Sequence, residues 1–202
     1  DGVWKSADGG ETWRNMGLGA TGRISRVLIH PTNPNIVWVG ALGHAHAPQP
    51  ERGVYRTMDG GDSWEHVLFV DENTGASSVE VDPNNPRILY AGMWHVIVNT
   101  WGRESGGPGS GLYVSRDAGD TWNKLEGNGL PLRTIGKVDV CVTPADSNRI
   151  YALIETGDGV PLNGEETDNG ELWRSDDGAK TWQLVTYNQN FGGRTAYYNN
   201  CA

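Results

Sequence analysis

Short apolar runs alternate with polar positions along most of this chain, and clusters of glycine, proline, asparagine and aspartate separate them. Residues 23–41, 77–93 and 136–154 each contain an alternating apolar segment, a turn of Pro, Asn or Asp, and a second apolar segment. A two-residue period is typical of half-buried β-strands, and turns of this composition connect strands. Good helix formers never run far enough between glycines and prolines to predict a convincing helix. The pattern predicts an all-β protein.

A second pattern, S/T-x-D-x-G-x-T/S-W, keeps step with the first. Its four copies are residues 6–13, 57–64, 115–122 and 175–182. Each copy lies between two further short apolar runs, so the complete unit has four strands and recurs about every 50 to 60 residues. Four strands at that period are typical of one blade of a β-propeller. The sequence therefore predicts one β-propeller domain of about four to five blades.

The blades can be placed along the chain. Residues 1–18 supply the last two strands of a first blade, residues 23–70, 76–126 and 135–187 supply three complete blades, and a tail follows at 188–202. An open sheet edge favours unwanted pairing, so the ring is expected to close. A tail strand at 197–200, a missing segment, or a second copy of the chain in a homo-oligomer could close it, and the sequence leaves these alternatives open.

The aspartate of each repeated turn has a structural interpretation. Its side chain can accept hydrogen bonds from backbone amides of its own turn, and the glycine supplies a backbone conformation that side chains resist. We predict that these aspartates hold the fold rather than catalyse a reaction; they are Asp8, Asp59, Asp117 and Asp177. The fourth turn departs from the pattern, because Ala179 stands where glycine is expected.

Charge narrows the choice of partner. The chain has 16 Lys and Arg against 25 Asp and Glu, a formal net charge of −9. Such an acidic chain argues against nucleic acid and anionic membrane surfaces as partners, because both attract clustered basic side chains. No apolar run approaches the roughly 18 residues of a membrane-spanning helix, so no membrane insertion is expected.

Processing and cysteine content add two expectations. No secretory leader is visible, and because the chain opens at Asp1 we expect an upstream part to have been removed. Two cysteines, Cys141 and Cys201, do not make a disulfide framework. Cys141 stands inside an apolar run and is predicted to be a small buried apolar residue.

The repeated turns resemble those of the Asp-box, or BNR-repeat, propellers, a group that includes sialidases, xyloglucan-degrading enzymes, sortilin-type receptors and a photosystem II assembly factor. Residues 2–187 further resemble the N-terminal propeller of large bacterial "glycosyl hydrolase, BNR repeat" and sortilin-like proteins, in the segments HPTNPNIVWVGALGH, PERGVYRTMDGG, LFVDENTGA, ESGGPGSGLYVS and RIYALIE. The tail FGGRTAYYNNCA departs from the likeness. The resemblance implies a propeller fold, a periplasmic or secreted location, and hydrolysis of glycosidic bonds.

The order of strands predicts where a site would lie. Successive strands are antiparallel, so every second connection emerges on the same face. The aspartate turns share one face, while the long, variable loops 40–53, 92–111 and 155–170 share the other with the shorter loops 70–76 and 126–136. Function usually resides on loops that a rigid frame holds, so the candidate site is the face opposite the aspartate turns.

Candidate residues on that face fall into three groups. Histidines and charged residues suited to proton transfer are the candidate catalytic residues: His44, His46, Glu51, Arg103 and Glu104. Arginines and an aromatic residue suited to substrate binding are Arg23, Trp101 and Arg133. Hard oxygen ligands suited to calcium are Asp71, Glu72 and Asn73. Loop 155–170 adds paired carboxylates of the kind that glycoside hydrolysis requires: Glu155, Asp158, Glu165, Glu166 and Asp168.

Three functions remain open. The first is a glycosyl-hydrolase-like propeller with its site on the loop face. The second is a lactone or ester hydrolase in which calcium at the propeller centre polarises a carbonyl group and a histidine handles protons. The third is a non-catalytic module that binds carbohydrate or protein. Each predicts a small-molecule, glycan or protein ligand and no organic cofactor, with calcium as the candidate ion.

Overall fold

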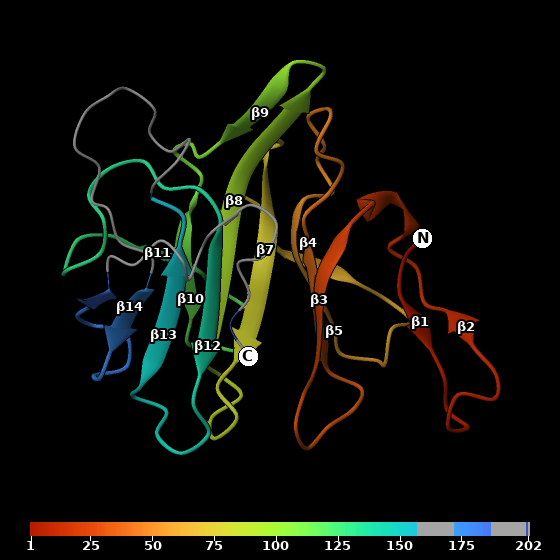
Figure 1. Ribbon diagram of the computed structural model, residues 1–202. Coiled ribbons are helices and arrows are strands. Elements are labelled where there is room, and N and C mark those ends of the chain that lie inside the picture. The colour runs from red at the N-terminus through yellow and green to blue at the C-terminus, as the bar shows by residue number, and fades with distance from the viewer. Residues whose placement is uncertain (157–171, 187–200, 202) are drawn as a thin grey trace.

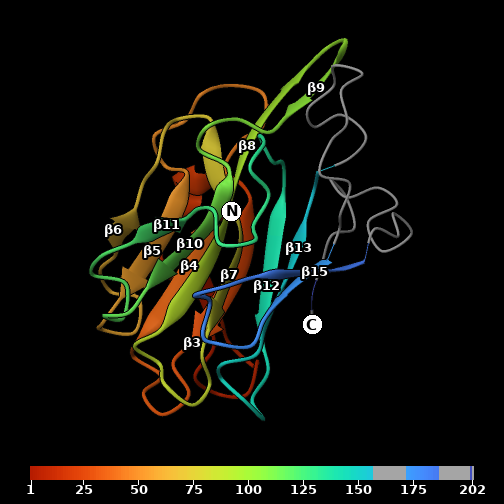
Figure 2. The ribbon, with the colours of Figure 1, turned by 90° about the vertical axis from the view of Figure 1, so that its left-hand side faces the viewer.

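The protein is almost entirely β-structure. A computed structural model describes residues 1–156, 172–186 and 201 and shows upright sheets arranged side by side (Figures 1 and 2). A two-stranded hairpin at the N-terminus is followed by three sheets of antiparallel strands. The one helix of the described ranges is a single 3-10 turn, Gly19–Thr21, so no helix there is long and apolar enough to cross a membrane. The predicted β-propeller fold is confirmed.

The strands repeat in four sets. The N-terminal hairpin holds β1 (Trp4–Lys5) and β2 (Arg14–Asn15). The second blade holds β3 (Ile24–Ile29), β4 (Val37–Ala41), β5 (Gly53–Thr57) and β6 (Glu65–Leu68). The third holds β7 (Thr74–Val81), β8 (Leu89–Asn99), β9 (Gly102–Ser105), β10 (Gly111–Ser115) and β11 (Asn123–Leu125). The fourth holds β12 (Val138–Val142), β13 (Ile150–Ile154), β14 (Leu172–Ser175) and β15 (Gln183–Thr186).

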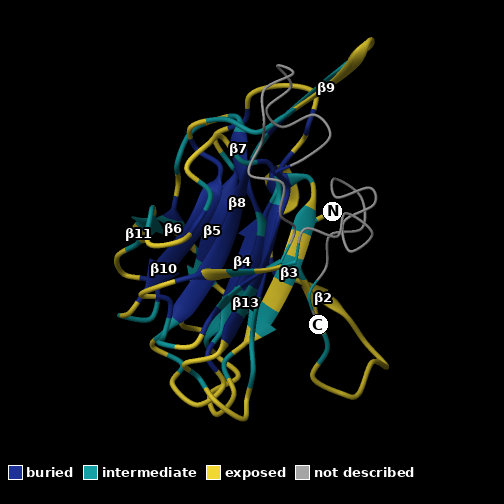
Figure 3. Cartoon of the chain, turned by 60° about the vertical axis from the view of Figure 1, so that its left-hand side comes forward, coloured by how far each residue is buried: buried dark blue, intermediate teal, exposed yellow. Residues whose placement is uncertain are grey.

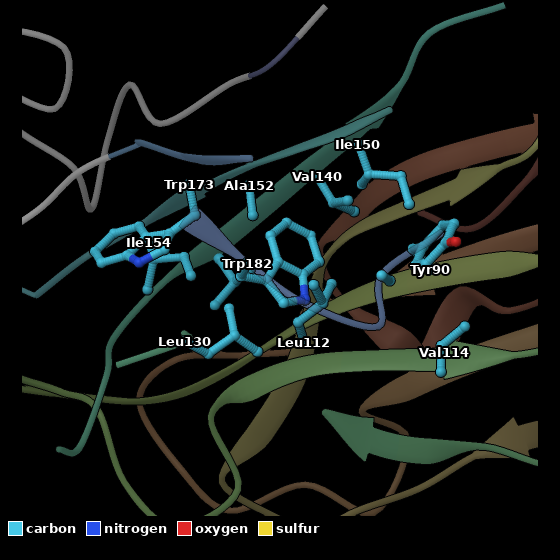
Figure 4. Close-up of a cluster of buried hydrophobic side chains, with 12 residues drawn as sticks. Tyr90, Leu112, Val114, Leu130, Val140, Ile150, Ala152, Ile154, Trp173 and Trp182 are labelled. Atoms are coloured by element: carbon cyan, nitrogen blue, oxygen red, sulfur yellow. The ribbon is translucent and has the colours of Figure 1, made fainter. Parts of the chain in front are cut away.

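The core lies between the blades rather than within one sheet. Tyr90 and Leu112 of the third blade pack with Val140, Ile150 and Trp173 of the fourth (Figure 4). A second cluster joins the second and third blades in the same way. The outer face of β3 is more exposed than these interfaces (Figure 3). Strand residues with apolar side chains therefore stabilise the protein chiefly by stacking one blade on the next.

Two serines in β-bulges link neighbouring blades. The register of β3 with β4 shifts at Ser25, and the register of β7 with β8 shifts at Ser77. The Ser25 hydroxyl donates to the carbonyl oxygen of Ala76 (2.7 Å), and the Ser77 hydroxyl donates to that of Val138 (2.6 Å). A bulge leaves one residue out of the ladder, so its side chain is available to bond the inner strand of the next blade.

Each of the four aspartate turns has the same pattern of hydrogen bonds. In each turn the Thr or Ser four residues after the aspartate donates its backbone amide to one carboxylate oxygen at 2.9 Å. Its hydroxyl donates to the other oxygen at 2.5–2.6 Å. The Ser or Thr two residues before the aspartate donates its hydroxyl to the same carboxylate. Every described oxygen of these carboxylates therefore bonds its own turn.

The alanine of the fourth turn adopts the backbone conformation that glycine has elsewhere. Ala179 has a φ of 69°, and its counterparts Gly10, Gly61 and Gly119 have φ values of 98°, 102° and 98°. Its amide donates to Ser175 as the glycine amides do to their own turns. The turn network thus imposes the left-handed conformation on alanine at a steric cost.

Two sequence expectations are corrected. The predicted loop 92–111 is mostly strand, because β8 continues to Asn99 and turns back as β9 in a hairpin. Cys141 is not a lone apolar residue, because it forms a disulfide with Cys201 across a Cα–Cα distance of 5.7 Å. Sixty residues separate the two cysteines, so only the fold brings them together. The predicted closing strand at 197–200 lies outside the described residues.

The aspartate turns should make stability depend on pH. The hydroxyl and amide of the following Thr lower the pKa of Asp8 and Asp117 to about 2. A carboxyl group whose pKa is lower in the folded state stabilises the fold above its unfolded pKa of about 4, and that stability is lost as pH falls toward 2. We expect the melting temperature to fall steeply between pH 4 and pH 2, measured by circular dichroism.

Removing one of these carboxylates should lower the stability of the protein at neutral pH as well. In Asp59→Ala the turn amide and hydroxyl of Ser63 lose their acceptor, so we expect the melting temperature to fall by about 3–8 °C. Asp146→Ala, in a turn of another kind on the same face, is the comparison variant. Equal melting temperatures for Asp59→Ala and the wild type would contradict the structural role.

Candidate functional site

The two ends of the sheets differ. The aspartate turns and the short turns between first and second strands lie at one end, and the longer connections and the β8–β9 hairpin lie at the other (Figure 1). We call the second end the loop face. It consists of residues 42–52, residues 69–73, the β8–β9 hairpin and residues 126–137. Of the candidate residues that the structure describes, all but Arg23 and Glu155 lie in these segments.

Arg52 holds three of these connections together. Its side chain is wholly buried, and its guanidinium donates to the carbonyl oxygens of His44 (2.5 Å), Ala47 (3.1 Å), Val96 (3.1 Å) and Asn73. Burial lowers the pKa of Arg52, and the charge of nearby Asp71 opposes that shift. The sequence analysis missed this residue, because nothing in its local pattern shows that an arginine beside a β-strand is buried.

The two predicted histidines contact different elements. Residues 45 and 46 form a turn. The His44 ring lies against Gly22, where a Cβ atom would come within 2.7 Å of it. The Nδ1 atom of His46 lies 3.2 Å from the carbonyl oxygen of Val98 in β8. Both residues are exposed on the loop face, and their catalytic roles stay predictions.

The β8–β9 hairpin carries three of the predicted residues. Trp101 stands at its turn with 86% of its surface exposed. Arg103 and Glu104 follow in β9, opposite Val98 and Ile97 of β8. Adjacent strand residues point to opposite faces of a hairpin, so the Arg103 and Glu104 side chains diverge. The hairpin does not bring them together as a pair.

Arg103 instead lies beside Glu155, at the end of β13. Its Nη2 atom is 3.7 Å from the Oε1 atom of Glu155, whose side chain is 1% exposed. The other carboxylate oxygen accepts from the Ser105 hydroxyl (2.6 Å) and the Lys137 amide (2.9 Å). Burial lowers the pKa of the Lys137 ammonium group. Of the acidic residues predicted in loop 155–170, Asp158, Glu165, Glu166 and Asp168 lie outside the described residues.

The predicted calcium ligands lie where β7 begins. The Asp71 carboxylate accepts from the Asn73 amide (2.8 Å) and the Thr74 hydroxyl (2.8 Å). The Nδ1 atom of His95, which the sequence analysis did not select, is 3.9 Å from Asp71. Glu72 is exposed. Within the described ranges no three His, Cys, Asp or Glu residues gather as a metal site, and calcium binding stays a prediction.

The remaining candidates are dispersed. Glu51 accepts the Tyr55 hydroxyl through its backbone carbonyl. The backbone oxygen of Arg23 accepts from the amide of Leu42 (2.8 Å), at the start of the inner strand. Arg133 lines a cavity of about 330 Å³ between the third and fourth blades, with an apolar floor that includes Leu112 and Leu130. Arg23 and Arg133 therefore lie beside different blades.

The stacked sheets and the four repeated turns define the protein as an Asp-box β-propeller. The sequence profile of the Sortilin-Vps10 family, described as sortilin, neurotensin receptor 3, matches residues 1–128. The chain belongs to this family.

Xyloglucanases are among the relatives of the chain. It is 29% identical over 188 residues to a xyloglucanase of Hypocrea jecorina, covering 87% of this chain and 19% of that protein. It is 25% identical over 177 residues to xyloglucanase Xgh74A of Acetivibrio thermocellus, covering 80% and 20%. The chain thus spans about a fifth of the length of these relatives.

Solved structures of the GH74 class share the fold. The enzyme of Niastella koreensis matches with a TM-score of 0.63 at 22% identity, covering 91% of this chain and 26% of that one. The xyloglucanase of Xanthomonas campestris matches with a TM-score of 0.63 at 17% identity, covering 98% and 29%. At these identities the likeness establishes the propeller architecture alone.

The buried guanidinium of Arg52 should stabilise the connections of the loop face. Arg52→Lys replaces a planar donor group with a point charge that cannot reach four carbonyl oxygens. We expect the free energy of unfolding to fall by about 2–4 kcal/mol, because buried acceptors lose their partners. Arg87→Lys, at an exposed position, should change it by less than about 0.5 kcal/mol. Urea unfolding measures both, and equal values would contradict the role of Arg52.

Proposed function

We propose that this propeller binds a neutral glycan on its loop face and belongs to a protein of the glycoside-hydrolase type. The names of its relatives support the ligand class, because they are xyloglucanases. The −9 net charge supports a neutral rather than an anionic ligand. The disulfide between Cys141 and Cys201 supports a periplasmic or secreted location, since such bonds persist in oxidising compartments.

The observation that carries the proposal is the exposure of Trp101. Trp101 is 86% exposed and stands at the turn of a paired hairpin, so its indole ring is accessible to a ligand. The turn is ordered by the Trp101 amide, which donates to the Asn99 side chain (3.2 Å). The apolar face of a sugar ring stacks on such a surface, while its hydroxyls bond polar groups nearby.

A non-catalytic binding module is the second candidate. Glycoside hydrolysis requires two carboxyl groups across the scissile bond. Of the described carboxylates on the loop face, Glu155 is buried, Glu51 is partly buried and Asp71 bonds its own turn. The exposed ones, Glu72, Glu104 and Glu126, stand on three different connections. This distribution favours binding by the described part of the chain and leaves hydrolysis to be tested directly.

Substitution of the exposed tryptophan tests binding. We expect Trp101→Ala to raise the dissociation constant for xyloglucan oligosaccharides by about tenfold, measured by isothermal titration calorimetry. Trp13→Ala removes an exposed tryptophan from the opposite face and should leave the constant unchanged. Equal losses in both variants, or none in either, would contradict a binding site at the hairpin.

Hydrolysis of the same oligosaccharides separates enzyme from binding module. We expect His46→Ala to lower kcat/KM by about 10²-fold, because histidine transfers protons near neutral pH. His30→Ala, on the opposite face, is the matched control. A wild-type protein that binds the oligosaccharides and releases no product would identify a binding module.

A further inference from the structure

The cavity of about 330 Å³ between the third and fourth blades borders the loop face. Its lining comes from the connection at 126–135, from the end of β11, from the segment that leads into β10, and from Ile154 of β13. Of the candidate residues predicted from sequence, Arg133 alone is among the described residues that line it. Concave sites of this size, apolar with a few polar groups, are typical places for a small ligand or for part of a larger one.

The floor of the cavity is aliphatic. Leu112 and Ile154 are 1% exposed, and Leu130 is 8% exposed. The three side chains lie close together around Trp182, in the cluster that joins the two blades (Figure 4). The described residues that line the cavity include no aromatic ring. The floor therefore suits a small aliphatic group better than the stacked face of a sugar ring.

Ser110 is the one polar side chain of this described lining that is more than nine-tenths buried. It is 2% exposed and stands directly before β10. Its oxygen accepts the backbone amide of His95 (2.9 Å), which holds the side chain in place. Within the described part of the chain its O–H group has no acceptor. A buried donor without an acceptor costs free energy, and a carbonyl oxygen in the cavity would satisfy it.

The charged residues of the lining are more exposed than Ser110. The ammonium group of Lys124 lies 3.3 Å from the Oε1 atom of Glu126 and donates to the carbonyl oxygen of Pro108 (2.8 Å). Arg133, like Glu126, is exposed. Because water and their own partners stabilise such groups, they do not require a charged ligand. The buried part of the cavity, an aliphatic floor with one O–H donor, therefore decides which group fits.

We propose that this cavity binds an acetyl group carried by a sugar of the glycan. The inference rests on the proposed glycan-binding function and assigns a ligand class to one place on the loop face. The methyl group contacts Leu112, Leu130 and Ile154, and the carbonyl oxygen accepts the hydroxyl proton of Ser110. An unsubstituted sugar hydroxyl would leave the aliphatic floor in contact with water. Ester and amide acetyl groups share this chemistry.

A matched pair of ligands tests the inference. O-acetylated xyloglucan oligosaccharides and the same oligosaccharides after mild alkaline deacetylation differ only in the acetyl groups. We expect deacetylation to raise the dissociation constant of the wild-type protein about tenfold in isothermal titration calorimetry, the size of effect that a small aliphatic group has in an apolar pocket. Chitin oligosaccharides carry amide acetyl groups. Tighter binding of these than of the O-acetylated form would assign the cavity to N-acetyl groups, and weaker binding would assign it to O-acetyl groups.

Two variants locate the preference in the cavity. Thr134→Phe fills the cavity from an exposed position of its lining, without a change at Ser110, and should reduce the tenfold preference to less than about twofold. Thr32→Phe makes the same change at an exposed position on the opposite face and should keep the preference. Ser110→Ala should reduce it to about threefold. That variant also removes the acceptor of the His95 amide, so Thr134→Phe decides the outcome if Ser110→Ala folds poorly.

The outcomes separate this inference from the proposed function. Equal affinity of the wild-type protein for the acetylated and deacetylated forms, or a full preference in Thr134→Phe, would overturn the acetyl site. If Trp101→Ala still weakens binding of both forms in that case, the proposed function stands. If the wild-type protein binds none of the oligosaccharides, the proposed function fails and the acetyl site fails with it.

Discussion

A blade of a propeller cannot bury its own faces, and this constraint governs the rest of the structure. The apolar side chains of a blade leave water only when another sheet lies against it. The two main clusters of buried residues each join two blades. Stacking sets the inner strands β3, β7 and β12 side by side, and the serines of the two bulges add a hydrogen bond from each blade to the next.

The same stacking builds the loop face from residues that are distant in sequence. Arg52 of one blade bonds carbonyl oxygens of the next, and Glu155 of another blade lies against the hairpin between them. Both are charged groups withdrawn from water, and each is compensated by groups of a neighbouring blade. The polar core of the loop face therefore orients its connections, while exposed groups such as Trp101 remain available to a ligand.

The two ends of the sheets show how a repeated scaffold accommodates a variable function. At one end, four turns form nearly identical hydrogen bonds. Ala179 adopts a left-handed backbone because it takes the place of glycine in this pattern. At the other end the connections share no pattern, and one of them has become the β8–β9 hairpin. Family membership follows from the repeated end, whereas the glycan site that we propose lies at the variable end. For this reason, a comparison with relatives of low sequence identity shows the architecture of the chain and leaves its substrate open.

The sequence by itself determined the blades, because two local signals recur in step: alternation in the strands and the side-chain hydrogen bonds of the aspartate turns, which form within eight residues. The order of strands also predicted that Trp101 and Arg103 lie at the end of the sheets opposite the aspartate turns, where the β8–β9 hairpin is found. Tertiary structure alone decided that Arg52 is buried, that Glu155 meets Arg103, that Cys141 pairs with Cys201, and that His44 and His46 contact different elements. Each of these depends on which blade lies beside which. The alternation of residues along one strand shows which side chains share a face of the sheet. It does not show which blade covers that face.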